Sequence, residues 1–247
     1  MYYGIDIGST YIKIIGMDKE KNILEKVVLS TLAGAQDTVS TYLQDKNVEG
    51  IIFTGYGRYM IDSFEKSKVV SEIQAHAKGI TYFFDNVEVV IDIGGQDSKV
   101  ILLGDNGSFI DFKMNDKCAA GTGKFLEIAA SRLGYSLDDF GLNCQNPTKE
   151  VEINSMCAVF AESEVISLVA KKETPQNIGY GVHMSIGTRV ANMAKSMARG
   201  RVTAFSGGAA QNPLLAKILS QELESDILVP QYPQFVGAIG ACMLAVK

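Results

Sequence analysis

The 247-residue chain has little of what several classes of protein require. It contains only two histidines, His76 and His183, which are too few for a zinc site, and its four cysteines are irregularly spaced, which argues against a disulfide framework. No block of like charges forms a tail or a polybasic patch, and the longest apolar run, 235–246, is too short to span a bilayer. We therefore expect no membrane anchor, and a metal, redox or purely buried role for the cysteines.

What is present indicates a compact protein. With 47% hydrophobic and 21% charged residues, the chain can bury a sizeable core, in one large or two small domains. A formal net charge of −5 argues against a nucleic-acid-binding surface, so proteins and small anions are the expected partners. The sequence opens on a β-rich run, 2–7, and not on a signal peptide, so we expect a cytoplasmic protein.

Two cysteines stand where helices are expected to begin. Cys118 lies in NDKCAAGTGKFLE (115–127), a glycine-rich turn that opens into a predicted helix. Cys157 comes 39 residues later (157 − 118), after the strand-like VEINSM (151–156) and at the start of the amphipathic segment 157–172. A helix N-terminus offers unpaired N–H groups and the positive end of a dipole, which suits thiolate or sulfide. Two cysteines are half of a four-thiolate iron–sulfur site, and a twofold dimer would supply the rest.

The N-terminal segment GIDIGST (4–10) joins the first strand to a return strand, 11–18. Asp6 stands at the end of the first strand, where an acid could hold a hydrated Mg²⁺. Backbone N–H and hydroxyl groups that could bind phosphate oxygens follow it, at Gly8, Ser9 and Thr10. An ordinary hairpin turn explains a single motif of this kind about as well, so both interpretations stay open for this copy.

The segment VEVVIDIGGQDSKV (87–100) repeats that arrangement. It has an apolar strand, then Asp92, a glycine pair at Gly94 and Gly95, and a return strand over 98–104. The two aspartates are 86 residues apart (92 − 6). Two such hairpins could face each other across a cleft and clamp one polyphosphate, so the pair is far more specific than either copy.

Hydrophobic periodicity predicts the other elements. The expected strands are 23–29, 48–57, 201–208 and 226–230, and the expected helices are 35–45, 69–84, 181–199, 213–223 and 235–246. The glycine pair Gly207 and Gly208 would let a flat ring approach the backbone, although an ordinary strand-to-helix turn is the simpler interpretation. Small residues over 237–241 allow close packing of the last helix, either as a hinge-crossing helix or as a core helix.

Four segments, in this order, resemble the nucleotide motifs of the actin, Hsp70 and sugar-kinase ATPase fold. GIDIGST and VVIDIGGQDSKV are similar to its two phosphate motifs, FSGGAAQN (205–212) to its adenosine motif and FVGAIGA (235–241) to its second connecting helix. The resemblance covers nearly the whole chain. It implies an α/β protein with two ribonuclease-H-like domains and a nucleotide cleft between them. The implied domains are 1–68 with 235–247, and 69–234, the second carrying the cluster cysteines and the dimer interface.

Within this fold, three segments resemble the activators of 2-hydroxyacyl-CoA dehydratases, which are relatives of the ATPase subunits of benzoyl-CoA reductase. They are NDKCAAGTGKFLE, SMCAVFAESEVISL (155–168) and TGYGR (54–58). In that family one 4Fe-4S cluster bridges a homodimer, and its ligands fall here on Cys118 and Cys157 of both protomers. ATP binding and hydrolysis change the angle between the helices below the cluster, so that an electron passes to a partner at very low potential.

The resemblance therefore implies an ATP-dependent electron-transfer activator. Its electron acceptor would be a 2-hydroxyacyl-CoA dehydratase or another iron–sulfur reductase, and its donor a ferredoxin or flavodoxin. By the same resemblance, Asp6 and Asp92 would hold Mg²⁺ through water, and Gln96, Glu162 or Glu72 would orient the attacking water. ATP or ADP would be bound by Gly8, Ser9, Thr10, Lys13, Gly94, Gly95, Gln96, Gly207, Gly208 and Gln211.

Two cysteines, Cys144 and Cys242, do not match the ligand positions, and we expect both to be structural. A capping role competes with a catalytic role for Glu162, because acids suit the first turns of a helix. Two other functions fit parts of the sequence. The phosphate motifs alone would suit a small-molecule kinase, and inert thiols would suit a scaffold ATPase of the filament or chaperone class. Neither explains two cysteines at two helix N-termini.

Overall fold

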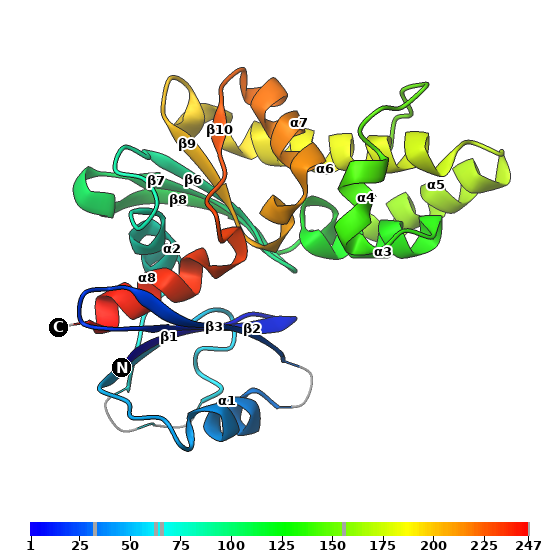
Figure 1. Cartoon of the computed structure of the whole chain (residues 1–247). Helices are drawn as coiled ribbons and strands as arrows, with labels where there is room; N and C mark the ends of the chain where they lie inside the picture. Colours follow the sequence, from blue (N-terminus) through cyan, green and yellow to red (C-terminus); the bar gives the residue numbers. More distant parts are fainter. Residues whose placement is uncertain (32–33, 62–63, 65–66, 155–156, 247) are drawn as a thin grey trace. The chain divides into compact units, whose positions relative to one another are not determined.

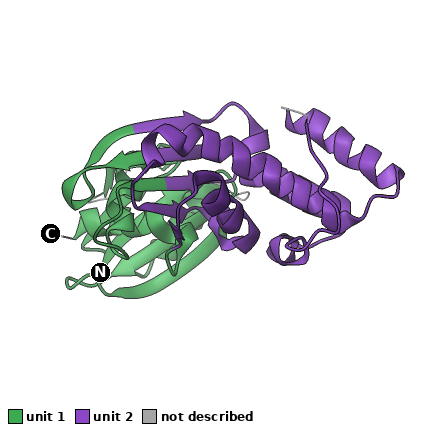
Figure 2. Cartoon of the chain, turned by 90° about the horizontal axis from the view of Figure 1, so that it is seen from above, with its two compact units in different colours: residues 1–90, 101–111, 230–247 green, residues 91–100, 112–229 purple. Residues whose placement is uncertain are grey.

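The computed structural model describes residues 1–31, 34–61, 64, 67–154 and 157–246. The chain folds into two compact units, coloured green and purple in Figure 2. Unit 1 comprises Met1–Val90, Ile101–Asp111 and Pro230–Lys247, and unit 2 comprises Ile91–Val100 and Phe112–Val229. The domain boundaries implied by the resemblance stay a prediction, since compactness groups residues by packing and not by function.

A mixed five-stranded sheet forms the centre of unit 1. Its strands are β1 (Tyr2–Ile7), β2 (Tyr11–Met17), β3 (Ile23–Ser30), β4 (Gly50–Thr54) and β5 (Ser67–Val69), in the order β3-β2-β1-β4-β5. The pair β1–β2 is antiparallel, whereas β1–β4 and β4–β5 are parallel. All residues of β1 and β4 are buried, while β3 alternates between half-buried and exposed residues, as a strand at a sheet edge does.

Two helices, α1 (Ala35–Leu43) and α8 (Val236–Ala245), cover opposite faces of this sheet (Figure 1). Successive side chains of a strand point to opposite faces. Tyr3, Ile5 and Ile7 accordingly pack with α1, whereas Tyr2 packs with α8. Asp6, two residues from Gly4 and four from Tyr2, therefore points to the face that α8 covers.

Helix α8 packs closely against β1 and against α2 (Glu72–Ile80), because glycines line the contacts. A Cβ on Gly240 would lie 1.8 Å from the carbonyl oxygen of Ala75, and one on Gly79 would lie 1.9 Å from that of Val236. A Cβ on Gly4 would lie 2.0 Å from the oxygen of Ala238. The close packing predicted for the small residues of the last helix is thus confirmed.

The second sheet contains β6 (Val89–Ile93), β7 (Ser98–Leu103), β8 (Phe109–Asn115), β9 (Thr203–Ser206) and β10 (Ile227–Leu228), in the order β10-β9-β6-β7-β8. The boundaries between the units fall within β6, β7 and β8. A short parallel pair, β9–β10, closes one side of the sheet. The strands β6 and β9 are neighbours, so the residues that follow them meet at one edge of the sheet.

The helices of unit 2 gather around one long helix, α6 (Pro175–Ala198), which contacts all of the others. These are α3 (Gly123–Leu133), α4 (Leu137–Asn143), α5 (Ala158–Ala170) and α7 (Pro213–Leu223). Both α6 and α7 begin with a proline behind a capping side chain, at Thr174 and Asn212, which accept hydrogen bonds from N–H groups three residues on. Short 3₁₀ segments occupy Asp105–Gly107, Ala119–Gly121, Gly208–Gln211 and Pro233–Phe235.

The structure corrects three sequence-based expectations. The segment 69–84 is not one helix: β5 ends at Val69, and α2 begins at Glu72 behind a Ser71–Gln74 capping box that fixes its first turn. Residues 151–154 form no strand, and 155–156 lie outside the described residues. The strand β8 and the helix α4 were not predicted, because β8 is largely exposed and α4 spans only seven residues.

Two cysteines lie in the cores of their units, as expected. Cys144 is fully buried beside Gly179, and burial raises the pKa of its thiol to about 11. Cys242 is fully buried under β1, where its thiol donates to the carbonyl oxygen of Tyr2 at 3.1 Å, and burial raises its pKa to about 12. In the part of the chain that the structure describes, no helix is both long and apolar enough to cross a membrane.

A buried histidine, His183, ties α6 to the start of α7. Its Nδ1 donates to the carbonyl oxygen of Gly179 at 2.6 Å, its Nε2 accepts from Asn212 Nδ2 at 2.8 Å, and its ring packs at a tilt against that of Phe140. Burial lowers the pKa of His183 from 6.5 to about 4. The imidazole is therefore neutral in the folded protein at neutral pH.

This lowered pKa predicts acid sensitivity. Between pH 6.5 and 4 the unfolded chain takes up a proton that the folded chain does not, so stability falls as the pH falls through this window, by up to about 3 kcal/mol. Urea unfolding at a series of pH values should show this loss. In the variant His183→Gln, the free energy of unfolding should depend less steeply on pH between pH 6.5 and 5. An unchanged slope would refute the attribution of this pH dependence to His183.

Candidate functional site

The two strand–Asp–x–Gly hairpins have the same turn. In unit 1 the N–H of Gly8 donates to the carbonyl oxygen of Tyr11 at 3.1 Å, and in unit 2 the N–H of Gly94 donates to that of Asp97 at 2.9 Å. In each case the aspartate stands one residue before the end of its strand. The internal repeat predicted from the sequence is therefore confirmed in three dimensions.

In unit 2 the carboxylate of Asp92 is buried and surrounded by polar groups. Ser206, at the end of β9, donates to its Oδ1 at 3.1 Å, and the ammonium of Lys99 lies 3.5 Å from its Oδ2. Lys99 is also buried and makes a second ion pair, at 2.8 Å, with Asp97 in the hairpin turn. The lysine therefore links the aspartate at the end of β6 to the turn that follows it.

Sequence reasoning missed Lys99 and Ser206. A signal for the lysine was present, because Lys99 follows Asp92 by seven residues as Lys13 follows Asp6. In unit 1 the ammonium of Lys13 lies beside the turn, 3.1 Å from the position of a Cβ on Gly8. Both hairpins thus place a lysine of the return strand inside the motif.

The loop after β9 lies against the same aspartate. A Cβ on Gly207 would lie 2.4 Å from the carbonyl oxygen of Ile93 and 2.8 Å from Oδ1 of Asp92, and its φ of +90° is in the left-handed region. Gly208 has open space around it, and Gln211 is exposed, with its side chain donating to the oxygen of Gly208. Unit 2 therefore brings together the predicted residues of the second phosphate turn and the adenosine loop, including the exposed Gln96.

In unit 1 the side chain of Asp6, a residue of β1, points toward α8. The position of a Cβ on Gly237 lies 3.1 Å from Oδ2 of Asp6 and 2.9 Å from Nε2 of His76, so the carboxylate and the imidazole approach the same point of α8. Both side chains are buried. His76 is thus a core histidine of unit 1. Its place beside Asp6 followed no sequence signal, because it depends on how α2 packs against α8.

The hairpin turn after β6 is bonded directly to the helix that follows Cys118. The N–H of Gly123 donates to the carbonyl oxygen of Gly94 at 2.9 Å, and the N–H of Lys124 donates to that of Gly95 at 2.9 Å. These are the first two residues of α3. The two hydrogen bonds satisfy two of the N–H groups that the start of a helix leaves without partners. They also connect α3 to the turn through backbone atoms alone.

Cys118 precedes the 3₁₀ turn Ala119–Gly121 and is half-buried. The side chain of Asn115 holds its backbone on both sides, since Oδ1 accepts from the Cys118 N–H at 3.2 Å and Nδ2 donates to the Cys118 oxygen at 2.9 Å. Cys157 is exposed and precedes α5, whose first hydrogen bond runs from the N–H of Ala161 to its oxygen at 2.9 Å. Helix α5 contacts both α3 and the 3₁₀ turn after Cys118.

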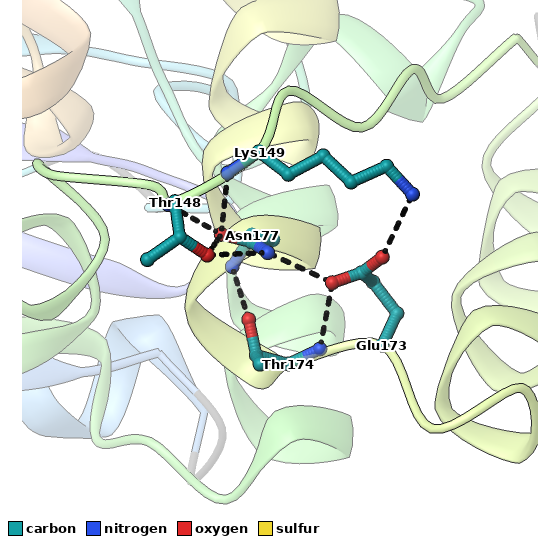
Figure 3. Close-up of polar contacts among 5 residues, drawn as sticks. All are labelled: Thr148, Lys149, Glu173, Thr174 and Asn177. Atoms are coloured by element: carbon teal, nitrogen blue, oxygen red, sulfur yellow. Dashed lines mark hydrogen bonds and ion pairs between the residues drawn. The ribbon is translucent and has the colours of Figure 1, made fainter.

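The segment that leads to Cys157 is fastened to α6 and to α5. The buried side chain of Asn177 accepts from the N–H of Thr148 at 2.9 Å and donates to Glu173, which also pairs with Lys149 (Figure 3). Further along, the carboxylate of Glu164 on α5 accepts from the N–H of Asn154, with distances of 3.2 and 3.1 Å. The backbone before Cys157 is therefore held at two points by side chains and not by a sheet.

Of the candidates for orienting water, Glu162 forms an ion pair with Arg132 that joins α5 to α3, with 2.6 Å between Oε1 and Nη2. Gln96 is exposed in its turn, and Glu72 lies in the first turn of α2. Which of them acts on water stays a prediction. Among the described residues, no three Cys, His, Asp or Glu side chains converge as a metal site.

The fold is shared with known nucleotide-binding proteins. A ROK family glucokinase from Streptomyces griseus superimposes with a TM-score of 0.60 at 16% identity, covering 99% of this chain and 98% of the glucokinase, a likeness that shows the fold alone. Two mixed sheets with repeated Asp–x–Gly hairpins define the class of α/β ATPase folds that includes actin, Hsp70 and the sugar kinases. The predicted fold class is confirmed.

Within that class, the chain belongs to the BadF/BadG/BcrA/BcrD ATPase family, whose profile matches residues 3–245. It is 38% identical over 252 residues to the (R)-2-hydroxyglutaryl-CoA dehydratase activating ATPase of Acidaminococcus fermentans, covering 99% of this chain and 96% of that protein. The activator of the 2-hydroxyisocaproyl-CoA dehydratase from Clostridium difficile, solved with bound ADPNP, superimposes with a TM-score of 0.92 at 34% identity, covering 100% of this chain and 94% of that structure. The predicted resemblance to dehydratase activators is confirmed.

The buried ion pair of unit 2 predicts a large effect of one substitution. Lys99→Met would leave Asp92 charged and buried without its cation, and should lower the free energy of unfolding by about 3 kcal/mol. The matched control is Lys124→Met, which removes an exposed pair with Glu127 and should cost less than about 1 kcal/mol. Urea unfolding measures both. Equal losses in the two variants would contradict the role given to Lys99.

Proposed function

We propose that this protein is an ATP-dependent electron-transfer activator, a homodimer with one 4Fe-4S cluster bound between its protomers. It would activate a 2-hydroxyacyl-CoA dehydratase or a related iron–sulfur reductase. The relatives named above are activators of such dehydratases, and one of them was solved with an ATP analogue. Family membership and near-complete coverage support carrying this activity over to the present chain.

One observation carries the proposal. The turn predicted to bind phosphate and the helix that follows Cys118 share two backbone hydrogen bonds, from Gly123 to Gly94 and from Lys124 to Gly95. Any shift of the turn on nucleotide binding or hydrolysis would have to move the start of α3 or break these bonds. Such a link has no evident use in a simple kinase, whereas an activator needs one between its nucleotide and its redox site.

The residues around the cysteines fit a bridging cluster. Cys118 and Cys157 both precede helical turns, neither is in a disulfide, and the N–H groups at the start of α5 are suited to donate to sulfur. When bound, a 4Fe-4S cluster supplies a carrier of single electrons at low potential. The chain's own part is to hold two thiolates on adjacent elements and to fix their backbone through Asn115 and Glu164.

The nucleotide would be held by both hairpins. Asp6 and Asp92 would hold a hydrated Mg²⁺, and the turns after them, with Lys13, would bind the phosphates. Gly207, Gly208 and Gln211 would border the adenosine. Lys99 and Ser206 keep the carboxylate of Asp92 oriented before any ligand arrives, which lowers the cost of ordering it on binding. Gln96 or Glu162 would orient the water that attacks the γ-phosphate.

A second copy of the chain and an acceptor protein would dock near Cys157. The first turn of α5 exposes Val159 and Phe160, each at 68%, next to this cysteine. Large exposed apolar side chains at one place are typical of a protein interface. The donor would be a ferredoxin or flavodoxin, as the resemblance implies.

Iron analysis tests the proposal. Anaerobically purified protein should contain about four irons per dimer, and Cys118→Ala or Cys157→Ala should abolish iron and sulfide binding. The matched controls are Cys144→Ala and Cys242→Ala, because these thiols are fully buried in the cores of their own units and should leave the iron content unchanged. Protein that stays colourless after reconstitution, or a fully loaded Cys118→Ala variant, would refute the proposal, and substrate-dependent phosphorylation would then favour a kinase.

Dimer stability supplies a separate test. Because the metal would be the sole covalent link between protomers, removing iron with a chelator should weaken the dimer. Sedimentation of the loaded and stripped protein at falling concentrations should show dissociation of the stripped form first. Equal dimer affinities would contradict a bridging role for the metal.

A further inference from the structure

A glycine in unit 1 occupies the same structural position as Gly207 in unit 2. Gly55 follows β4, which lies beside β1, and has a φ of +93°. A Cβ on Gly55 would lie 2.4 Å from Oδ1 of Asp6 and 2.5 Å from the carbonyl oxygen of Ile7. Gly207 makes the same approach to Asp92 and Ile93, at 2.8 and 2.4 Å. Each hairpin aspartate is therefore covered by a left-handed glycine from a neighbouring strand.

The loop that contains Gly55 is fastened to the end of β1. In the parallel pair β1–β4, Thr54 is the partner of Asp6, and beyond the strand the N–H of Gly57 donates to the carbonyl oxygen of Ile7 at 2.8 Å. The loop thus leaves the sheet at the edge where the turn Gly8–Tyr11 begins. Since its counterpart after β9 is assigned to the nucleotide, the TGYGR segment stands where a second nucleotide-binding loop is expected.

The two loops differ in what their hydroxyl groups do. Ser206, before Gly207, donates to Asp92, whereas the Oγ1 of Thr54, before Gly55, is fully buried and has no hydrogen-bond partner among the described residues. A buried hydroxyl of this kind costs free energy unless a ligand or water completes its bonding. The hydroxyl before Gly55 therefore keeps its hydrogen-bonding capacity, whereas that of Ser206 is bonded to Asp92.

The loop also carries a positioned guanidinium. Nη1 of Arg58 donates to the carbonyl oxygen of Gly55 at 3.0 Å, and its Cζ lies 4.7 Å from the ring centroid of Tyr59. The carbonyl oxygen and the ring hold the guanidinium next to Gly55, the glycine that covers Asp6. Arginine offers several donors in a planar fork, which suits phosphate oxygens. Tyr56 and Tyr59 are both exposed, at 75% and 76%.

We propose that the loop Thr54–Arg58 is part of the nucleotide site, in which Gly55 positions the carboxylate of Asp6 and Arg58 binds the phosphate chain. This inference rests on the proposed function, because it assumes that Asp6 and the turn after it face an Mg²⁺-bound nucleotide. It adds to the two hairpin turns a third phosphate-binding segment, which belongs to unit 1. The ligand is the anionic end of a nucleoside di- or triphosphate.

Arg58 is tested by comparing nucleotides on the full-length protein. Arg58→Ala should weaken binding of ATP by roughly tenfold to a hundredfold and that of AMP by less than about threefold, because only the longer phosphate chain reaches the guanidinium. The matched control is Arg201→Ala, whose guanidinium also donates to a nearby carbonyl oxygen, that of Met197, and which should leave ATP affinity unchanged. Calorimetric titration measures each affinity. Equal ATP affinities of Arg58→Ala and Arg201→Ala would overturn the proposal for Arg58.

Gly55 is tested through Mg²⁺. Gly55→Ala should displace the carboxylate of Asp6 and raise the Mg²⁺ concentration needed for half-maximal ATP binding by roughly tenfold, as Asp6→Asn should. The control Gly134→Ala places a Cβ at a φ of +79° with no atom within 4 Å, so it bears the same backbone strain without touching the site. An Mg²⁺ dependence that is unchanged in Gly55→Ala, or shifted equally in Gly134→Ala, would refute a positioning role.

Two further results distinguish a failure of the inference about this loop from a failure of the proposed function. If Gly55→Ala does not fold, Arg58→Lys decides, since it keeps the charge but loses the planar fork and should bind ATP with an intermediate affinity. Wild-type affinity in Arg58→Lys and Arg58→Ala together would overturn the inference. Wild-type protein that binds no ATP at all would instead refute the proposed function itself.

Discussion

The pair of hydrogen bonds between the hairpin turn after β6 and the start of α3 is the constraint on which the rest of this molecule depends. Gly94 and Gly95 offer carbonyl oxygens to the N–H groups of Gly123 and Lys124, so one end of a helix is capped by the turn of a distant hairpin. A Cβ on Gly123 would lie 3.0 Å from the oxygen of Gly94, so a side chain there would crowd the approach. The cysteine segment is therefore connected to the turn by short, stiff backbone contacts.

A second constraint is the precise placement of two buried carboxylates. Each is covered by a glycine with positive φ. In unit 2 Lys99 and Ser206 hold the carboxylate of Asp92, and in unit 1 His76 approaches the same point of α8 as Asp6. Burying a carboxylate is costly unless its oxygens are paired. The glycines are needed because any side chain would occupy the place of an aspartate oxygen. Such a costly arrangement is more readily explained by ligand binding than by stability.

Much of the fold could be read from local pattern. Apolar runs ended by Asp–x–Gly predicted both hairpins, and the start of α7 at Pro213 was predicted as well, whereas α6 begins at Pro175 behind Thr174, six residues before the predicted start at 181. The misjudged segments are those in which local pattern and environment disagree. Residues 151–154 have an alternating pattern but are bonded to α5 through Glu164, and β8 exposes apolar side chains that periodicity alone would not assign to a strand.

The sequence by itself determined the repeated hairpins, the positions of Cys118 and Cys157 before helical segments and the family to which the chain belongs, because each is written in consecutive residues. Tertiary structure alone decided which residues surround Asp6 and Asp92. Ser206 reaches Asp92 across 114 positions of sequence, and Gly55 and Gly237 reach Asp6 from a neighbouring strand and from the last helix. Such contacts depend on strand order and helix packing, which no local pattern specifies.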